Sequence, residues 1–302
     1  MENQHNMEPA WAGMEDQHPR GIPVVKKDEY WLYAEKSSEG WHITGVRENA
    51  QHGLSEVEIP AEVDGKPVVS LRLDWTYDPE HPAYVGQLTF PDCIPGIDGR
   101  SLRYVLRAVM QTTEKPCYLE KENLVLTPDG KRVVAALYSH QRYYFVPAGV
   151  EVIGKEAFFE RRVDRVFLPD SVRVIDEGAF RDMPRLRSMV VPEGTTHIGA
   201  LAFAGSGAEA VILPDSLQEL GMGAFAGCSL LEVTIPSRIR RLEKTFMYCT
   251  ELRRVHLSEG LEEIGPYAFQ VCERLQRVVL PASVKKVDEA AFAECDAEIV
   301  RS

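Results

Sequence analysis

The residue types that carry most enzyme chemistry are present in this chain, but not at the spacing that catalysis or metal binding requires. Its eight histidines are scattered, with no HExxH sequence and no other pair at ligand spacing. No GxSxG nucleophile turn, no phosphate-binding glycine loop and no GxGxxG after a strand occurs. The sequence therefore predicts no catalytic residue, no metal site and no cofactor, and favours a protein that is not an enzyme.

One cysteine lies where covalent chemistry is conceivable. Cys117, in TTEKPCYLEKEN, is close to a lysine in a segment that we expect to be an exposed loop. A nucleophilic thiol needs a depressed pKa. An ordinary, unreactive surface thiol is therefore a more common role for such a cysteine than a catalytic nucleophile. The alternative function is an enzyme, or a regulatory subunit of one, with its site in the irregular segment 72–147. Convergence of Cys117, His81 and His140 in one pocket would support that alternative.

Two further candidates have plainer interpretations. His256 occupies an outward-facing strand position, where a solvated histidine is more common than a general base. The Glu262 and Glu263 pair is compatible with acid–base chemistry or with a calcium ligand. The matching positions of neighbouring repeats, however, hold the basic pairs 240–241 and 285–286. A solvated face that alternates in charge is therefore the better interpretation.

The charge of the chain argues against a polyanionic partner. Lys and Arg number 34 against 46 Asp and Glu, which gives a net charge of −12, and both sides of Pro147 are acidic. Nucleic-acid binding needs a concentrated basic surface, so we expect no nucleic-acid partner. No apolar run is long enough to span a membrane. The N-terminus also lacks the pattern of a signal peptide, which predicts a cytoplasmic protein.

The dominant feature of the sequence is an internal repeat. A phenylalanine recurs every 21–23 residues, at positions 158, 180, 203, 225, 246, 269 and 292. Prolines show the same period independently, at positions 147, 169, 192, 214, 236 and 281, with Ser258 in the remaining place. A fixed period of this length is the signature of a stacked repeat architecture.

Each repeat contains two short apolar alternations that predict strands. LQRVVLP, residues 275–281, is typical of the first, and Val284 with Val287 forms the second. Proline ends the first strand because it cannot donate to a ladder hydrogen bond. One such unit cannot bury its own apolar face, but stacked units share a continuous core. The sequence therefore predicts a β-rich solenoid with an internal spine of phenylalanine rings.

The repeat form LxxVxLPxxVxxIGxxAFxxC resembles the BspA-like leucine-rich repeats, and residues 257–281 match it nearly throughout. The resemblance covers 147–302 and extends to VEIPAEVDGKPVVSL at 57–71, where Asp64-Gly65 would form a turn. In that family a β-hairpin often interrupts the stack, and Asp129-Gly130 would be its turn here. Family members are bacterial and protistan, and many are surface or secreted proteins linked to adhesion. The missing signal peptide predicts a cytoplasmic location, but the resemblance leaves a surface or secreted location open.

These features divide the chain into four segments: a disordered polar tail at 1–28, an N-terminal cap and degenerate repeat region at 29–115, an inserted β-hairpin at 116–147 and the leucine-rich repeat solenoid at 148–302. Within the second segment, the alternation at 30–46 predicts a hairpin that caps the first coil. The spacing of apolar residues in GRSLRYVLRAVMQ, 99–111, predicts a helix.

Four cysteines follow the repeat, since each lies three residues after a phenylalanine. They are Cys228, Cys249, Cys272 and Cys295. A small side chain suits a tightly stacked position, and free cysteine is among the most buried residue types. We expect this cysteine column to be reduced, buried and structural.

The first strand of each repeat places alternate residues outward. One outward row consists of Phe167, Val190, Ile212, Thr234, His256 and Val279, and the neighbouring row includes Arg165, Arg254 and Arg277. A contiguous exposed apolar strip is unusual in a monomer and predicts a partner-binding surface with an arginine rim. Two alternatives stay open: β-branched residues simply suit strands, or another segment covers the strip.

The predicted function is a non-catalytic one: protein–protein interaction through this exposed face, including adhesion to a host or cell surface. A glycan is the alternative to a protein partner. The last half-repeat, 297–300, leaves a strand edge that templates association. We therefore expect a monomer with a weak tendency to form a homodimer.

Overall fold

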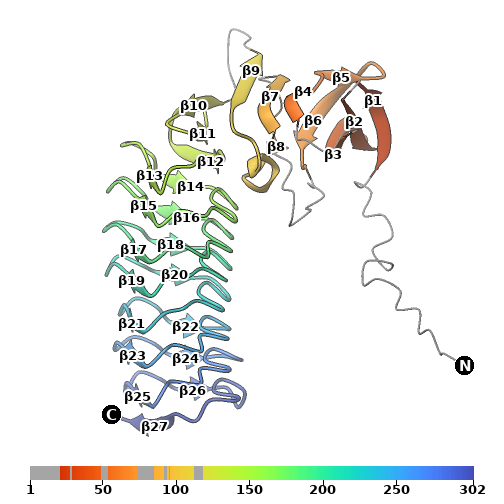
Figure 1. Ribbon diagram of the computed structural model, residues 1–302. Helices are drawn as coiled ribbons and strands as arrows, with labels where there is room; N and C mark the ends of the chain where they lie inside the picture. Colours follow the sequence, from red (N-terminus) through yellow and green to blue (C-terminus); the bar gives the residue numbers. More distant parts are fainter. Residues whose placement is uncertain are drawn as a thin grey trace, which may run out of the picture.

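The computed structural model describes residues 21–27, 29–48, 54–73, 85–91, 94, 96–111 and 118–302. Over 118–302 the chain winds into a solenoid whose coils stack along one axis (Figure 1). The solenoid predicted from the repeat is confirmed. The disordered tail predicted for 1–28 lies mostly outside the described residues. Its last part is ordered, because the apolar run at Ile22–Lys26 forms strand β1 against the next strand, Tyr30–Lys36.

Each coil contributes one strand to each of two columns of parallel strands (Figure 1). The first column contains β13 (Tyr143–Phe145), β15 (Arg165–Phe167), β17 (Ser188–Val190), β19 (Ala210–Ile212), β21 (Glu232–Ile235), β23 (Arg254–Leu257), β25 (Arg277–Leu280) and β27 (Glu298–Arg301). The second column contains β12 (Arg132–Ala136), β14 (Val152–Ile153), β16 (Val174–Ile175), β18 (His197–Ile198), β20 (Glu219–Leu220), β22 (Arg241–Leu242), β24 (Glu263–Ile264) and β26 (Lys286–Val287). The register is one repeat per step, so equivalent residues of neighbouring coils lie side by side.

The N-terminal part contains β1 (Ile22–Lys26), β2 (Tyr30–Lys36), β3 (Trp41–Glu48), β4 (Leu54–Glu58), β5 (Glu62–Val63), β6 (Lys66–Leu71), β7 (Val85–Pro91), β8 (Gly96–Ile97), the 3-10 helix η1 (Arg100–Leu102), β9 (Ala108–Gln111), β10 (Leu119–Lys121) and β11 (Leu124–Leu126). Strands β4, β7 and β9 pair in parallel, as do β3, β6 and β8. This region therefore repeats the two-column plan without the Ala-Phe signature. Both central residues of the predicted turn, Asp64 and Gly65, have positive φ, as a tight hairpin between β5 and β6 requires.

The helix predicted over 99–111 is wrong. The segment begins with one 3-10 turn and then becomes β9, which pairs in parallel with β7. The open edge of β7 decides this outcome, because the amide of Leu88 donates to the carbonyl of Arg107 (2.9 Å) and that of Leu106 to the carbonyl of Val85 (3.0 Å). Ladder bonds to an existing strand outweigh a weak helical propensity.

The hairpin of β11 and β12 separates two hydrophobic cores. Its turn is the predicted one, since the amide of Gly130, with φ +69°, donates to the carbonyl of Thr127 (2.8 Å). Side chains alternate between the two faces of a strand. Val133 of β12 thus packs into the solenoid core, whereas Val134 packs into the N-terminal core. Because β12 also pairs in parallel with β14, the hairpin continues the second column.

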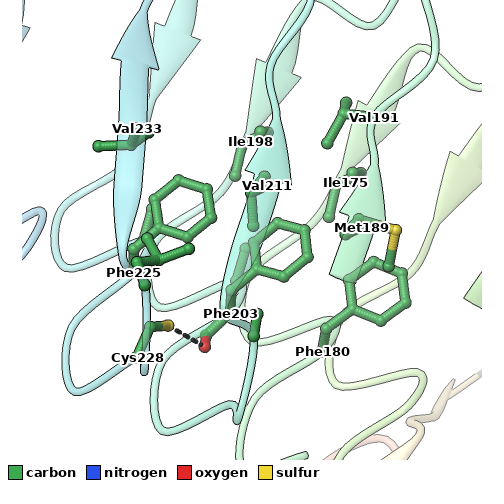
Figure 2. Packing of buried hydrophobic residues seen from close by; sticks show 14 of the residues in the cluster. Ile175, Phe180, Met189, Val191, Ile198, Phe203, Val211, Phe225, Cys228 and Val233 are labelled. Atoms are coloured by element: carbon green, nitrogen blue, oxygen red, sulfur yellow. Dashed lines mark hydrogen bonds between the residues drawn. The ribbon is translucent and has the colours of Figure 1, made fainter. Parts of the chain in front are cut away.

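A stack of phenylalanine rings fills the centre of the solenoid. Figure 2 shows Phe180, Phe203 and Phe225 lying one after another between the two columns. Neighbouring ring centroids from Phe158 to Phe292 are 5.1–5.7 Å apart, and the ring planes differ by 3–22°. The predicted spine is therefore present.

The turns around this spine hold side chains in a left-handed backbone conformation. Residues two positions before or after the phenylalanine often have positive φ, including Val271 at +56°. A β-branched residue is poorly suited to that conformation, whereas glycine adopts it freely.

Replacing Val271 by glycine should therefore stabilise the protein, by about 0.5–1 kcal/mol after allowing for the entropy of glycine in the unfolded chain. The amide of residue 271 would still donate to the carbonyl of Ala293. Chemical denaturation measures the change. The control is Thr234→Gly, an exposed strand substitution that should destabilise. A loss of stability in Val271→Gly would show that packing of the half-buried valine outweighs its backbone strain.

One coil is shorter than the others. Pro236 to Phe246 spans one residue fewer than Pro214 to Phe225 in the preceding coil. Strand β20 accordingly ends one sheet of the second column and β22 begins another, with no ladder between them in this described stretch. The rings of Phe225 and Phe246 are also the most widely spaced of the stack, at 5.7 Å. The missing residue thus interrupts the second column, while the turns on the far side remain bonded.

The two cores meet at a buried arginine. Arg161 lies three residues after Phe158, in the place that cysteine occupies in later coils. Its guanidinium donates hydrogen bonds to the carbonyls of Arg103 and Leu102, where η1 ends. Burial lowers the pKa of Arg161 to about 10, which leaves it charged at neutral pH. A charged donor thus connects the N-terminal core to the first solenoid coil.

Candidate binding surface

The first column presents an outward row of side chains that is apolar at its β13 end. The inward residues Val166 and Val211 are buried in the core, and the residues that alternate with them face outward. Phe167 is 42% exposed, and Val190 and Ile212 are each 62% exposed. These three predicted residues lie on consecutive coils, and no described segment covers them.

Phe145 belongs to the same row, although the row predicted from the sequence begins only at Phe167. It is in register with Phe167, is 60% exposed and stacks on that ring with centroids 4.7 Å apart and planes 8° from parallel. Tyr143, 44% exposed, precedes it on β13. The signal was present, because Phe145 lies one repeat before Phe167, but the insertion predicted at 116–147 removed it from the row. We call Phe145, Phe167, Val190 and Ile212 the apolar strip.

Beyond the apolar strip, the predicted row continues with two polar residues and one exposed valine. Thr234 and His256 are exposed and paired in register, and Val279 follows on β25. The Glu232 carboxylate contacts both the Arg254 guanidinium (Nε–Oε2 2.9 Å) and the His256 ring (Nε2–Oε1 3.0 Å). The hydrogen bond from Arg254 lowers the pKa of Glu232. This end of the row is therefore a charge-paired surface.

The three predicted rim arginines have different surroundings. Arg254 pairs with Glu232, and Arg277 lies 3.7 Å from the Glu298 carboxylate. Arg165, in contrast, forms no ion pair with any residue that the structure describes. It lines a hollow beside the apolar strip together with Arg142, Tyr143, Phe145, Asp164, Phe167 and Arg187. Positive charge that is free for a partner is thus concentrated at the aromatic end.

The acidic pair on the second column is structural. Glu262 pairs with Arg240 of the preceding coil (3.1 Å), and Glu263 pairs with Lys286 of the next (2.8 Å). These exposed pairs link equivalent positions of neighbouring coils, as a face of alternating charge predicts. A shallow groove lies nearby, lined by β16, β18, β20 and two arginines of the short coil. Across the described ranges, no group of three or more His, Cys, Asp or Glu side chains is arranged to hold a metal ion.

The residues proposed for an enzyme site can be placed only in part. His140 is exposed and its ring packs edge-on against Tyr138, with centroids 5.6 Å apart. Cys117 and His81 lie outside the described residues. The described structure also contains no helix that is long and apolar enough to cross a membrane.

The cysteine column lies inside the stack. Cys228, Cys249 and Cys272 are buried as free thiols, and each Sγ donates to a main-chain carbonyl 3.0–3.2 Å away. Figure 2 shows the bond from Cys228 to the carbonyl of Phe203. Cys295, in the last coil, is only half-buried. The predicted burial is correct for three of the four, and no described coil covers the outer side of Cys295.

Thiol labelling should reflect this difference. Burial raises the pKa of Cys228 and Cys272 to about 12, and that of Cys249 also lies well above its usual value. The reactive thiolate is therefore scarce even at about pH 9, where a free cysteine is mostly ionised. We expect native iodoacetamide labelling, followed residue by residue with mass spectrometry, to modify Cys295 before the other three cysteines of the column. Labelling of Cys249 as fast as in urea would contradict this structural role.

Comparison with known proteins identifies the repeat. The family described as "BspA type Leucine rich repeat region" matches six copies, over residues 138–245 and 174–298. These matches span more than half of the chain. No curated protein matches it.

Solved structures show a similar fold. A leucine-rich repeat protein from Eubacterium ventriosum aligns with a TM-score of 0.61 at 14% identity, covering 91% of this chain and 95% of that one. The pneumococcal vaccine antigen PcpA aligns with a TM-score of 0.50 at 16% identity, covering 92% and 81%. Together, the repeat match, the two strand columns and the phenylalanine spine show that the chain belongs to the BspA-type leucine-rich repeat family.

Proposed function

We propose that this chain is a non-catalytic leucine-rich repeat protein that binds a protein partner through the apolar strip. The observation that carries the proposal is the exposure of four large apolar side chains, Phe145, Phe167, Val190 and Ile212, on four consecutive coils. Isolated exposed apolar residues are normal, but a contiguous row along stacked coils marks an interaction surface.

The composition of the row favours a binding role over strand propensity alone. Propensity would account for valine and isoleucine at outward positions. It does not require two stacked phenylalanine rings, which are large, exposed and enriched in the centres of protein interfaces. The free charge beside them, Arg165 and Arg187, suits a partner that presents acidic groups around an apolar contact.

The double variant Phe167→Asp with Ile212→Asp should abolish partner binding and leave the thermal midpoint nearly unchanged. Two carboxylates at the centre of an apolar contact would remain desolvated and unpaired in the complex. Proteins captured on the immobilised wild-type chain would be identified by mass spectrometry, and the affinity of the purified partner measured by calorimetry.

The matched control is Met222→Asp with Tyr248→Asp, which places the same charges at two exposed apolar positions away from the strip. This control should bind the partner like the wild type. Equal binding by the strip variant would refute the proposal, and strip-dependent binding to an arrayed glycan would replace the protein partner with a carbohydrate. Adhesion to a host or cell surface is a narrower form of the proposal, and cell-adherence assays with the same variants test it.

A further inference from the structure

Strand β13 is the end strand of the first column. It pairs in parallel with β15 on one side, and no other described strand pairs with its second side. The second column does not stop at the same level, since β14 continues into β12, β11 and β10. Figure 1 shows β13 at the end of its column, with that hairpin extending only the neighbouring column. The described part of the chain thus covers one column end and leaves the other open.

The main-chain groups at this open edge are free to bond. The amide of Val146 donates to the carbonyl of Phe167 (2.9 Å), so residues 144 and 146 direct their main-chain groups toward β15. Alternation along a parallel strand then directs those of Tyr143 and Phe145 to the opposite side. No described segment forms a main-chain hydrogen bond with them there.

Strand β13 is short, with three residues, but it contains no charged side chain, proline or bulge. Proteins protect edge strands with charged side chains, proline or bulges. At the other end of the column, β27 has Glu298 and Arg301. Strand β13 instead reads Tyr-Tyr-Phe, with Tyr143 and Phe145 exposed. Such an edge is a template for an additional strand.

The side chains near the edge indicate which charge an added strand should carry. Arg142, Arg165 and Arg187 line the hollow beside Tyr143 and Phe145, where Asp164 is the only acidic residue of the lining. Arg142 is paired with Asp164. Arg165 and Arg187 are exposed and have no ion-pair partner in the described chain. Arg165 lies on β15, in register with Tyr143, so an added strand would meet its uncompensated positive charge across the exposed face of β13.

We infer that β13 accepts an extended acidic segment of the partner as an additional strand. The segment bonds to the main chain of Tyr143 and Phe145, and its acidic side chains lie on the outward face, directed across β13 toward Arg165. Main-chain bonds supply affinity in this mode of recognition, and side chains supply specificity. The inference rests on the proposed function, because it specifies how the partner engages the aromatic end of the apolar strip.

A synthetic peptide tests the edge without the natural partner. We expect the fluorescein-labelled peptide EVEVTVE to bind the full-length chain saturably, as measured by fluorescence anisotropy. KVKVTVK and an EVEVTVE analogue with N-methylated valines should each bind at least about tenfold more weakly, because one reverses the charge and the other removes main-chain donors. Failure of EVEVTVE to bind, or equal binding of the three peptides, would overturn the inference. The strip variants would still test the proposed function independently.

Two substitutions at one position separate the edge from the ring. Phe145→Pro removes the outward amide without removing a bond to β15, and Phe145→Val keeps that amide. We expect Phe145→Pro to bind EVEVTVE about tenfold more weakly than Phe145→Val, and equal affinities would contradict strand addition. Should the proline variant not fold, hydrogen exchange of the wild type decides, because the amides of Tyr143 and Phe145 must become protected when the peptide is added.

A second copy of this chain is the competing occupant. Light scattering over a range of concentrations distinguishes it. A wild-type dimer that Phe145→Pro converts to a monomer, with no binding of EVEVTVE, would assign the edge to self-association and overturn the acidic-segment inference.

Discussion

Replacing Phe203 with alanine is expected to lower the free energy of unfolding by about 3–5 kcal/mol. The ring is fully buried and stacks on both neighbours, with centroids 5.1 Å from those of Phe180 and Phe225. Removing it leaves a cavity that the rigid coils on either side cannot close. Denaturant unfolding followed by circular dichroism measures the loss.

The same substitution at Phe292 is the matched control. That ring is only half-buried and stacks on a single neighbour, Phe269, at 5.2 Å. In a one-dimensional array each coil is stabilised mainly by its neighbours. Phe292→Ala should therefore cost clearly less than Phe203→Ala. Equal losses at the two positions would show that the stacked spine is not the main source of stability.

The second large effect is expected at Arg161. Alanine at this position would leave the carbonyl of Arg103 buried without its donor, although that of Leu102 keeps the bond from the Val105 amide, and would open a cavity between the two cores. An unsatisfied buried polar group costs about 1–3 kcal/mol. Removing the buried charge offsets part of this cost, so we expect a net loss of about 2–4 kcal/mol.

Hydrogen exchange can show where that loss occurs. In Arg161→Ala, the amides of 96–108 should exchange faster, while those of the coils beyond residue 200 remain protected. Arg162→Ala is the control. The side chain of Arg162 is exposed, so alanine at this adjacent position should have little effect on exchange. Uniformly faster exchange throughout the solenoid would contradict a local role for Arg161.

The sequence was most informative where one residue type recurs for one physical reason. The phenylalanines, prolines and cysteines repeat because each coil must solve the same packing problem, and the outward positions of Phe167, Val190 and Ile212 follow from strand alternation. The period therefore predicted the solenoid, its spine and the exposed row.

Some features depend on contacts that a repeat pattern does not contain. Residues 99–111 have helical spacing, yet β7 offers them a ladder edge. Phe145 was excluded because the hairpin that precedes it resembled an insertion, although β12 continues the second column. Arg161 occupies a cysteine position, and only the neighbouring N-terminal core explains its type. The sequence shows the missing residue before Phe246, but not that the ladder breaks there.

That break has a mechanical consequence. Under tension along the stack, every other pair of adjacent coils from β14 to β26 would resist separation through ladder bonds in the second column as well as through the turns and the spine. Between β20 and β22 the second column carries no load, and the rings there are spaced most widely. A molecule pulled from its two ends would therefore meet a weak step here, and a second one between β15 and β17, where the first column has no ladder. One of these two steps lies beyond the surface that we propose binds the partner, and the other lies within it, between Phe167 on β15 and Val190 on β17.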